Sequence, residues 1–332
     1  MGNERKPSIA EVRQWLDVRN PLALSGAEVG VVSERNHLIY HVTKGERVYA
    51  LRLINPESYR RGEWISMTEE FEILKAIEPT GLGPRAYAFE WGAPYMTQPL
   101  SFMIQEFVEA ACFNGLKPLT EEHLVGAAWA IALLNQQPIS PERFPFMRKY
   151  VHEGFQRAKL AGYFRLVDSF RRLPRRDVLQ WAVRIMPIVR KTSHLLTKAE
   201  YLLPSEFSFH FDGAHTGNTY WRDGRTVFLD WQKISLRNDP SFTLVRFATS
   251  VGEKGVVPER VWETLVNSYL DVRPDAPNFP ELAWVRLLER QTADLVWVLW
   301  DYARRGDRRP VEQGTSVVPR YAAVQQMLLQ YG

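Results

Sequence analysis

A short polar segment between apolar runs holds the residues best suited to chemistry. It contains His210, Asp212, His215 and Asn218, and Asp230 follows the apolar run Val-Phe-Leu a little further on. A carboxylate at the end of a buried strand is costly unless it binds something, and carboxylate and amide oxygens are the ligands that Mg²⁺ prefers. We therefore expect Asn218 and Asp230 to hold a magnesium ion.

This arrangement leaves Asp212 to act on a substrate. The carboxylate could orient or deprotonate a hydroxyl that attacks the γ-phosphate of a nucleotide, a reaction whose catalysis is mainly positioning and charge neutralisation. The alternative is a turn rich in Asp, Gly and Asn, in which the Asp residues serve as caps. For any one of these residues taken alone, the turn is the better explanation.

The first third of the chain predicts a small antiparallel sheet with one helix. Two β-rich runs, at 38–42 and 47–54, are joined by the turn-like segment 43–46, and a third run lies at 101–108. Apolar residues recur at helical spacing before Pro79: Trp64, Met67, Phe71, Leu74 and Ile77.

From about residue 118 the pattern changes to long amphipathic helices. They are expected at 121–134, 176–196, 259–270 and 281–305. One hairpin interrupts them within 207–231, with its turn at 222–225. The fold class is therefore α+β, with a small β-rich lobe followed by a large helical lobe.

Composition narrows the function classes. The 332 residues are 45% hydrophobic and 24% charged, as in folded globular proteins, and the net charge of +4 is weak for a nucleic-acid-binding protein. A single cysteine, the lack of a signal-peptide pattern and the lack of a long apolar run favour a cytoplasmic protein without a membrane segment. We expect no nucleic-acid or membrane partner, and the oligomeric state stays open.

The order His-x-Asp, Asn, turn, apolar-apolar-Asp-Trp resembles the catalytic and metal-binding loops of the aminoglycoside phosphotransferase and choline kinase superfamily. The resemblance implies a protein-kinase-like two-lobe fold that uses ATP and Mg²⁺. It places a nucleotide-binding lobe at 1–108, a hinge at 105–109 and a helical lobe at 109–332. Within the helical lobe it implies a catalytic loop at 207–218, a metal-binding strand end at 227–232 and an acceptor-site helix at 284–305.

The nucleotide lobe carries further motifs of this superfamily. Asn36 resembles a residue of the hairpin that covers the nucleotide, and Arg52 resembles the third-strand cation that meets the α- and β-phosphates. Glu70 resembles the helix glutamate that pairs with this cation, and Glu106 to Val108 resemble the hinge whose backbone binds adenine.

Physical chemistry supports a partner for the strand cation independently. A permanently charged guanidinium needs a carboxylate when no ligand is bound, and it can make bidentate contacts to phosphate when one is. By spacing alone Glu69 or Glu72 could equally be that partner, so the choice of Glu70 rests on the resemblance.

The C-terminal helix carries a candidate acceptor site. Trp297 and Trp300 lie three residues apart, and Asp301 lies four beyond Trp297, so they share a helix face. Two indoles and an acid suit a cationic amine. The segment resembles the end of bacterial choline kinases, and this resemblance suggests an amino alcohol such as choline or an aminoglycoside-like acceptor. Periodicity alone favours core packing of the indoles.

Several positions depart from the superfamily pattern. Asn218 lies six residues after Asp212 instead of the usual five, Gln232 stands where glutamate is common, and Thr243 and Asn135 replace an expected Asp and His. Two functions therefore stay open: a small-molecule kinase that phosphorylates a hydroxyl, and a catalytically weak kinase-like protein that binds nucleotide or a partner as a scaffold or sensor. Transfer to a protein side chain is a third.

Overall fold

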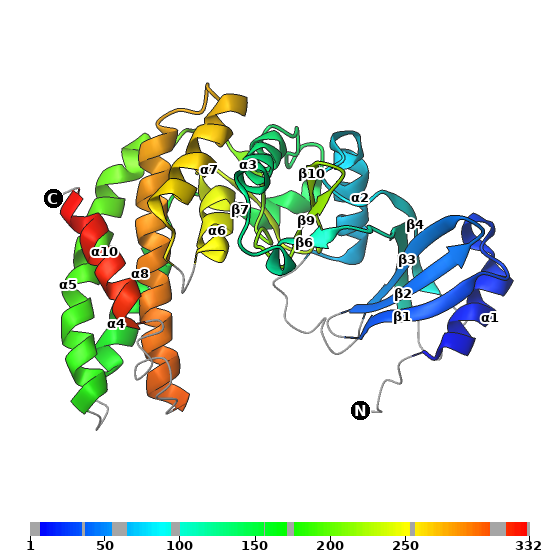
Figure 1. Ribbon diagram of the computed structural model, residues 1–332, viewed down its shortest axis with the longest axis horizontal. Coiled ribbons are helices and arrows are strands. Elements are labelled where there is room, and N and C mark those ends of the chain that lie inside the picture. The colour runs from blue at the N-terminus through cyan, green and yellow to red at the C-terminus, as the bar shows by residue number, and fades with distance from the viewer. Residues whose placement is uncertain are drawn as a thin grey trace. The chain divides into compact units, whose positions relative to one another are not determined.

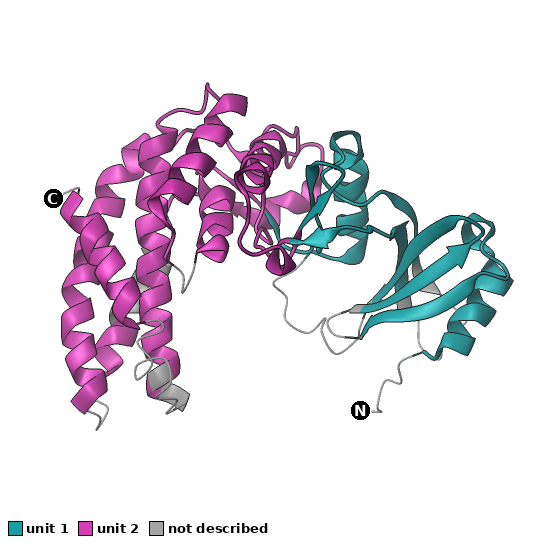
Figure 2. Cartoon of the chain, viewed as in Figure 1, with its two compact units in different colours: residues 1–112, 220–234 teal, residues 113–219, 235–332 magenta. Residues whose placement is uncertain are grey.

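A computed structural model describes most of the chain, in eight ranges: 7–34, 37–54, 65–93, 100–155, 157–170, 176–252, 256–305 and 317–330. The chain forms two compact units. Unit 1 comprises residues 1–112 and 220–234, and unit 2 comprises 113–219 and 235–332 (Figure 2). The fold is α+β, as predicted.

Unit 1 is built on a five-stranded antiparallel sheet with the order β1-β2-β3-β5-β4. Its strands are β1 (Glu28–Glu34), β2 (His37–Lys44), β3 (Arg47–Ile54), β4 (Ala86–Ala93) and β5 (Leu100–Glu106). The predicted β2–β3 hairpin is confirmed, and Gly45 in its turn has φ 60°, a conformation that favours glycine.

Two helices pack on opposite faces of this sheet. Leu51 and Leu53 of β3 pack in one core with Trp15 of α1 (Ile9–Arg19), whereas Arg52 points to the other face and contacts α2 (Met67–Ile77). The sequence pattern led us to expect one helix in this lobe, and α1 corrects that expectation. It begins with a capping box, in which Ser8 and Glu11 exchange hydrogen bonds.

A hairpin from far along the chain belongs to unit 1. Its strands β9 (Thr219–Arg222) and β10 (Arg225–Phe228) form a sheet with β6 (Ala111–Cys112). Asp223 and Gly224 have φ of 51° and 76°, as a tight hairpin turn requires. The Phe228 amide donates to the Leu82 carbonyl and the Ile65 amide to the Gln232 carbonyl. These hydrogen bonds join residues 220–234 to unit 1.

Unit 2 is mainly helical. Helices α4, α5, α8 and α10 lie side by side around one apolar core (Figure 1). The helices are α3 (Glu121–Asn135), α4 (Arg157–Phe170), α5 (Arg176–Ala199), α6 (Phe242–Val251), α7 (Glu259–Val272), α8 (Phe279–Arg305) and α10 (Val317–Gln330). A small sheet has the order β7-β11-β8, from β7 (Val151–His152), β11 (Ile234–Arg237) and β8 (Ser208–Phe211).

The remaining regular structure is short. Short 3₁₀ helices cover Pro21–Ala23, Glu78–Thr80, Phe113–Gly115, Pro145–Tyr150 and Glu200–Leu202. Across the described ranges, none of the helices combines the length and the apolar character needed to cross a bilayer.

Trp15 offers a test of the contribution of α1. Its indole is fully buried and meets the Phe102 ring edge-on, with the centroids 4.1 Å apart. We expect Trp15→Ala to lower the free energy of unfolding by about 3–5 kcal/mol, because it leaves a cavity under the sheet. Val18→Ala, at an exposed position of the same helix, should change it by less than ~0.5 kcal/mol. Urea unfolding measures both, and equal effects would contradict the packing of α1.

Candidate active site

The charged pair at the centre of unit 1 joins β3 to α2. The Arg52 guanidinium donates to both oxygens of Glu70, at 2.6 and 3.2 Å, and to Gln105 Oε1 at 3.3 Å. The two side chains are only 5% and 1% exposed. Burial opposes the charge of Arg52, but the Glu70 carboxylate overcomes this effect and raises the pKa of Arg52. Of the three candidate glutamates, Glu70 is therefore the partner.

The capping of α2 explains why Glu69 is not the partner. The Ser66 hydroxyl accepts from the Glu69 amide, and the Glu69 carboxylate accepts from the Ser66 amide. This reciprocal cap directs Glu69 to the helix N-terminus. Glu70, one residue further, is then turned toward the sheet.

The predicted metal-binding strand end lies against this pair. The Trp231 amide hydrogen-bonds the Glu70 carboxylate, and the buried Trp231 indole donates to the Phe228 carbonyl at 2.8 Å. The ring packs closely on Gly83, where a Cβ atom would come within 3.0 Å of the indole nitrogen. Trp231 therefore anchors the residue before it, Asp230, near Arg52.

Asp230 differs from the expectation in its burial. The apolar residues Val227 and Phe228 are buried, but the Asp230 side chain is exposed, so burial exerts no cost on it. Its backbone has φ 64°, a left-handed conformation that costs a non-glycine residue about 1–3 kcal/mol and persists only where neighbours enforce it. The anchored Trp231 enforces this backbone conformation. The exposed Asp230 carboxylate is thereby placed where it interacts electrostatically with Arg52.

Of the other expected nucleotide contacts, only the hinge is described. The Glu106 amide donates to the Arg85 carbonyl, and its carboxylate binds Arg222 at 2.7 Å. An adenine contact at Glu106 would therefore use its carbonyl, with Val108 two residues beyond. Asn36 lies outside the described residues.

Asp212, the predicted catalytic residue, lies in unit 2 just after β8. One carboxylate oxygen accepts from Ser235 Oγ at 2.6 Å and the other from the Arg237 guanidinium at 2.8 Å. Burial opposes ionisation, but the attraction of Arg237 and these hydrogen bonds hold the pKa of Asp212 below its usual value. The side chain keeps 21% exposure, so a substrate can still approach it.

The loop from Asp212 to Asn218 is one residue longer than the superfamily pattern, and it forms two successive turns. The Ala214 amide donates to the Phe211 carbonyl, and the Asn218 amide donates to the His215 carbonyl. Asn218 Nδ2 bonds the Gly213 carbonyl at 3.2 Å, which leaves its Oδ1 as the atom suited to a cation. His215 Nδ1 accepts from the Gly217 amide at 3.1 Å, so this histidine supports the turn.

Neutral groups hold the predicted catalytic loop at two positions where the superfamily pattern has an Asp and a His. His210 Nδ1 lies 2.9 Å from the Thr243 hydroxyl, and its Nε2 lies 2.9 Å from Ser208 Oγ, which donates to the Arg237 carbonyl. Asn135 Nδ2 donates to the carbonyl of Phe209, the residue before the histidine. These partners suit a neutral imidazole with its proton on Nε2. Burial and the nearby Arg237 lower the pKa of His210 to about 3.

The predicted acceptor residues share one face of α8. Trp297 and Trp300 meet edge-on, with ring centroids 5.1 Å apart. Trp297 is 48% exposed, whereas Trp300 packs partly against the apolar core. Asp301 is half-buried on the next turn. The Trp297 indole is thus accessible to a ligand, as an acceptor site requires, whereas the Trp300 indole packs against the core, as periodicity alone favours.

A group of arginines near this face was not expected from the sequence. Arg290 and Arg320 both bind Asp294, at 3.1 and 3.5 Å, and Arg246 lies in electrostatic reach of Asp294 and Asp212. Burial and Arg290 lower the pKa of Arg246. Arg246, Arg290 and Arg320 each have a buried nitrogen without a hydrogen-bond partner among the described residues. Arg246 therefore adds a positive charge within electrostatic reach of Asp212.

The two residues that the sequence predicts as metal ligands, Asn218 and Asp230, offer oxygen atoms only, and each is described within its own unit. Within the described ranges, no three His, Cys, Asp or Glu side chains gather into a metal site. Asn218 Oδ1 in unit 2 and the exposed Asp230 carboxylate in unit 1 are the groups that fit Mg²⁺, because hard cations take carboxylate and amide oxygens and usually keep several waters.

His210 predicts a pH dependence of stability. Because the folded-state pKa, about 3, lies below the unfolded value near 6.5, its contribution is complete above pH 6.5 and is lost as the pH falls toward 3. Between pH 6.5 and 5 the wild-type protein should lose about 2 kcal/mol more than His210→Asn. Urea unfolding at several pH values measures this difference. The exposed His194→Asn variant is the control, and a slope unchanged in His210→Asn would contradict the neutral histidine.

Comparisons with known proteins place this geometry in a structural context. The chain matches neither a known protein-family model nor a curated protein. It is similar to the structure of a spectinomycin phosphotransferase in complex with ADP and spectinomycin, with a TM-score of 0.60 at 12% identity over 97% of this chain and 100% of that one. It is also similar to a Plasmodium vivax ethanolamine kinase, with a TM-score of 0.57 at 14% identity over 93% and 85%. A choline/ethanolamine kinase family protein from Mesorhizobium loti gives 0.53 at 16% identity over 96% and 94%. The chain has the fold shared by the aminoglycoside phosphotransferases and the choline and ethanolamine kinases.

Proposed function

We propose that the protein is a small-molecule kinase that transfers the γ-phosphoryl group of ATP, with Mg²⁺, to a hydroxyl group. The observation that carries the proposal is the buried Arg52–Glu70 pair, tied through Trp231 to the strand end that bears Asp230. A structural ion pair alone would not require an exposed carboxylate in a strained conformation beside it. The structural neighbours include two phosphotransferases whose structures hold ADP.

In this proposal each group has a separate role. Arg52, oriented by Glu70, binds the α- and β-phosphates, and the backbone at Glu106 and Val108 binds adenine. Asn218 and Asp230 hold Mg²⁺, which neutralises charge on the phosphates. Asp212 orients the acceptor hydroxyl toward the γ-phosphorus.

The lowered pKa of Asp212 suits orientation better than strong base catalysis. A carboxylate held by Arg237 is ionised at neutral pH but accepts a proton weakly. Phosphoryl transfer through a loose transition state makes little demand on the base, because the hydroxyl loses its proton late. The Asp212 carboxylate then takes up that proton as the oxygen–phosphorus bond forms.

The same contacts motivate a second candidate function. Both Asp212 oxygens are already engaged, by Ser235 and Arg237, and Gln232 is neutral where glutamate is common. A catalytically weak kinase-like protein that binds nucleotide as a scaffold or sensor would carry these features. It would bind ATP and Mg²⁺ and turn over slowly with every acceptor.

Two substitutions separate these functions. Asp230→Ala should abolish phosphoryl transfer with the fold intact, and Asp212→Asn should lower kcat about 10²–10⁴-fold. Asp271→Asn, an exposed aspartate on α7, is the control and should leave kcat unchanged. ATP consumption is measured across amino alcohols, aminoglycosides, sugars and hydroxy acids. Stabilisation of the protein by ATP with Mg²⁺, without consumption for any acceptor, would favour the scaffold or sensor.

Two observations bear on the class of acceptor. The exposed Trp297 face suits a cationic amine, such as an amino alcohol or an aminoglycoside-like compound. The Arg246 guanidinium, which lies in electrostatic reach of Asp212, favours an acceptor that also carries a carboxylate or phosphate. We propose the anionic class, since its charge complements the residues nearest the reacting hydroxyl.

Arg246 tests the acceptor class. With hydroxy compounds that differ only in an acid or an amine group, kcat/KM should be higher for the acid. Arg246→Met should lower the kcat/KM of the acid about 10-fold or more and leave the KM for ATP unchanged, because a charge-assisted hydrogen bond is lost. If the amine is the better substrate and Trp297→Leu raises its KM, the acceptor is cationic.

A further inference from the structure

Charge is distributed unevenly along the chain. The segment 157–199, which contains α4 and α5, holds eleven Lys and Arg residues against two Asp residues, a net charge of +9. Because the whole chain carries +4, the remaining residues together carry −5. An asymmetry of this size within one chain suggests contact with an anionic surface, which the small overall charge conceals.

The cations of α5 lie on its outer face. The opposite face packs in the apolar core through residues such as Ile185 and Val189. Exposed residues recur every three or four positions along the helix, so they share one side of it. We call this side the α5 face, and its cations are Arg176, Arg184, Arg190, Lys191 and Lys198.

Among the described residues, these cations have no ion-pair partner to neutralise them. The Lys191 ammonium donates to the Leu328 carbonyl at 3.0 Å, and the Arg184 guanidinium lies over the Trp181 ring at 5.3 Å from its centroid. Neither contact brings a carboxylate. The positive charge of the α5 face is therefore available to an outside partner.

Exposed aliphatic side chains lie between these cations. Leu179 and Val183, one helical turn apart, are 37% and 54% exposed, and the exposed Pro187 follows them on the same face. Removal of this apolar area from water is favourable. The α5 face thus offers an apolar contact as well as a positive charge.

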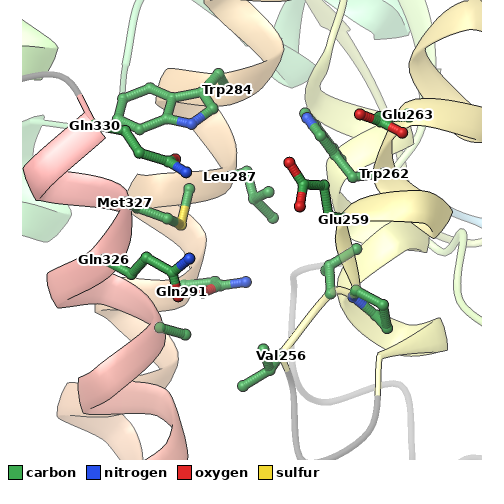
Figure 3. Close-up of a pocket in the computed structure, with 13 residues that line it drawn as sticks. Val256, Glu259, Trp262, Glu263, Trp284, Leu287, Gln291, Gln326, Met327 and Gln330 are labelled. Atoms are coloured by element: carbon green, nitrogen blue, oxygen red, sulfur yellow. The ribbon is translucent and has the colours of Figure 1, made fainter.

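Exposed carboxylates of α7 lie on another side of unit 2. Glu259 and Glu263 line a groove between α7, α8 and α10, and none of the described residues of α5 lines it (Figure 3). The only acid of α5, Asp177, is half-buried in the first turn, where it complements the helix dipole. The helix α10, which packs against α5, contains no acidic residue. The α5 face is therefore positive along its length.

The dimensions of the α5 face favour an extended partner. A helix rises roughly 33 Å from Arg176 to Lys198, so these cations cannot converge on one small anion. A lipid bilayer with anionic headgroups uses both kinds of residue, because the headgroups attract cations and the interface accepts aliphatic side chains. A nucleic acid would use the cations for its phosphates and would gain little from the exposed aliphatic pair.

We propose that the α5 face is a docking surface for an anionic lipid bilayer. Arg184, Arg190 and Lys198 interact with the headgroup phosphates, while Leu179 and Val183 enter the boundary between headgroups and acyl chains. This contact needs no helix that crosses the bilayer. It revises the expectation of no membrane partner to a peripheral association, and it does not depend on the proposed kinase activity.

Co-sedimentation of the full chain with lipid vesicles, without nucleotide, tests the proposal. The two probes are vesicles of phosphatidylcholine alone and vesicles in which about one-third of the lipid is phosphatidylserine. We expect saturable binding to the phosphatidylserine vesicles and binding about tenfold or more weaker to phosphatidylcholine alone. Added salt should weaken binding, because it screens exposed charges.

Variants assign the binding to the α5 face. Arg184→Gln/Arg190→Gln should weaken binding to the phosphatidylserine vesicles about tenfold or more. Arg143→Gln/Arg148→Gln makes the same change in net charge at exposed positions of unit 2 outside α5, and it should change binding by less than about twofold. Leu179→Ser/Val183→Ser should weaken binding about fivefold and leave its salt dependence unchanged. Thermal unfolding confirms that each variant is folded.

Three outcomes would overturn the proposal. The first is no binding of the wild-type protein to phosphatidylserine vesicles at low salt. The second is an equal loss of binding in the two arginine double variants, which would mean that only net charge matters. The third is binding to duplex DNA as tight as to the vesicles, with no effect of Leu179→Ser/Val183→Ser on either, which would make the partner a nucleic acid. The wild-type comparison remains decisive even if a variant does not fold.

Discussion

The buried ion pair between Arg52 and Glu70 is the constraint on which the organisation of unit 1 depends. Neither charge can stay in the interior alone, and removal of one partner from such a pair costs about 3–5 kcal/mol. The pair therefore holds α2 against β3, while the bond from Trp231 to Glu70 holds the distant 220–234 segment against α2. Asp230 takes its exposed, strained position as a consequence. One charge requirement thus joins three segments that are far apart in the sequence.

Unit 2 meets a comparable requirement with a different set of residues. Asp239 accepts from Arg286 at 2.5 Å in the interior, which connects the segment after β11 to α8. His210 stays neutral and is braced by hydroxyl groups, so an aspartate at position 243 is not needed to compensate a charge. The departures from the superfamily pattern at Thr243 and Asn135 are therefore mutually consistent. At these two positions Thr243 and Asn135 stand in place of an aspartate and a histidine, and both are neutral groups beside the neutral imidazole of His210.

Local patterns predicted the elements well, and they predicted long-range contacts poorly. Alternation and turn residues were sufficient for the β2–β3 hairpin, and helical spacing was sufficient for α3, α5, α7 and α8. The capping box at Ser8 and Glu11 signals α1, so this helix could have been predicted. The capping box at Ser66 and Glu69 engages Glu69 and leaves Glu70 as the partner of Arg52, so this pairing could have been predicted too. The arginine group could not have been, because its members come from three helices whose packing no local pattern specifies. The exposure of Asp230 likewise depends on the packing of Trp231 on Gly83.

Charge magnitudes support the anionic acceptor class that we propose. A unit charge at roughly 8 Å in an effective dielectric constant of about 20 is worth ~2 kcal/mol, and the Arg246 guanidinium lies in electrostatic reach of Asp212. An exposed indole attracts a cation by only about 0.5–1 kcal/mol. Repulsion by Arg246 would therefore offset the attraction of Trp297 for an amine, whereas the same charge would attract an anionic group. Under the proposed function, the aromatic face of α8 contacts the apolar body of the acceptor, and Arg246 favours an anionic group on it.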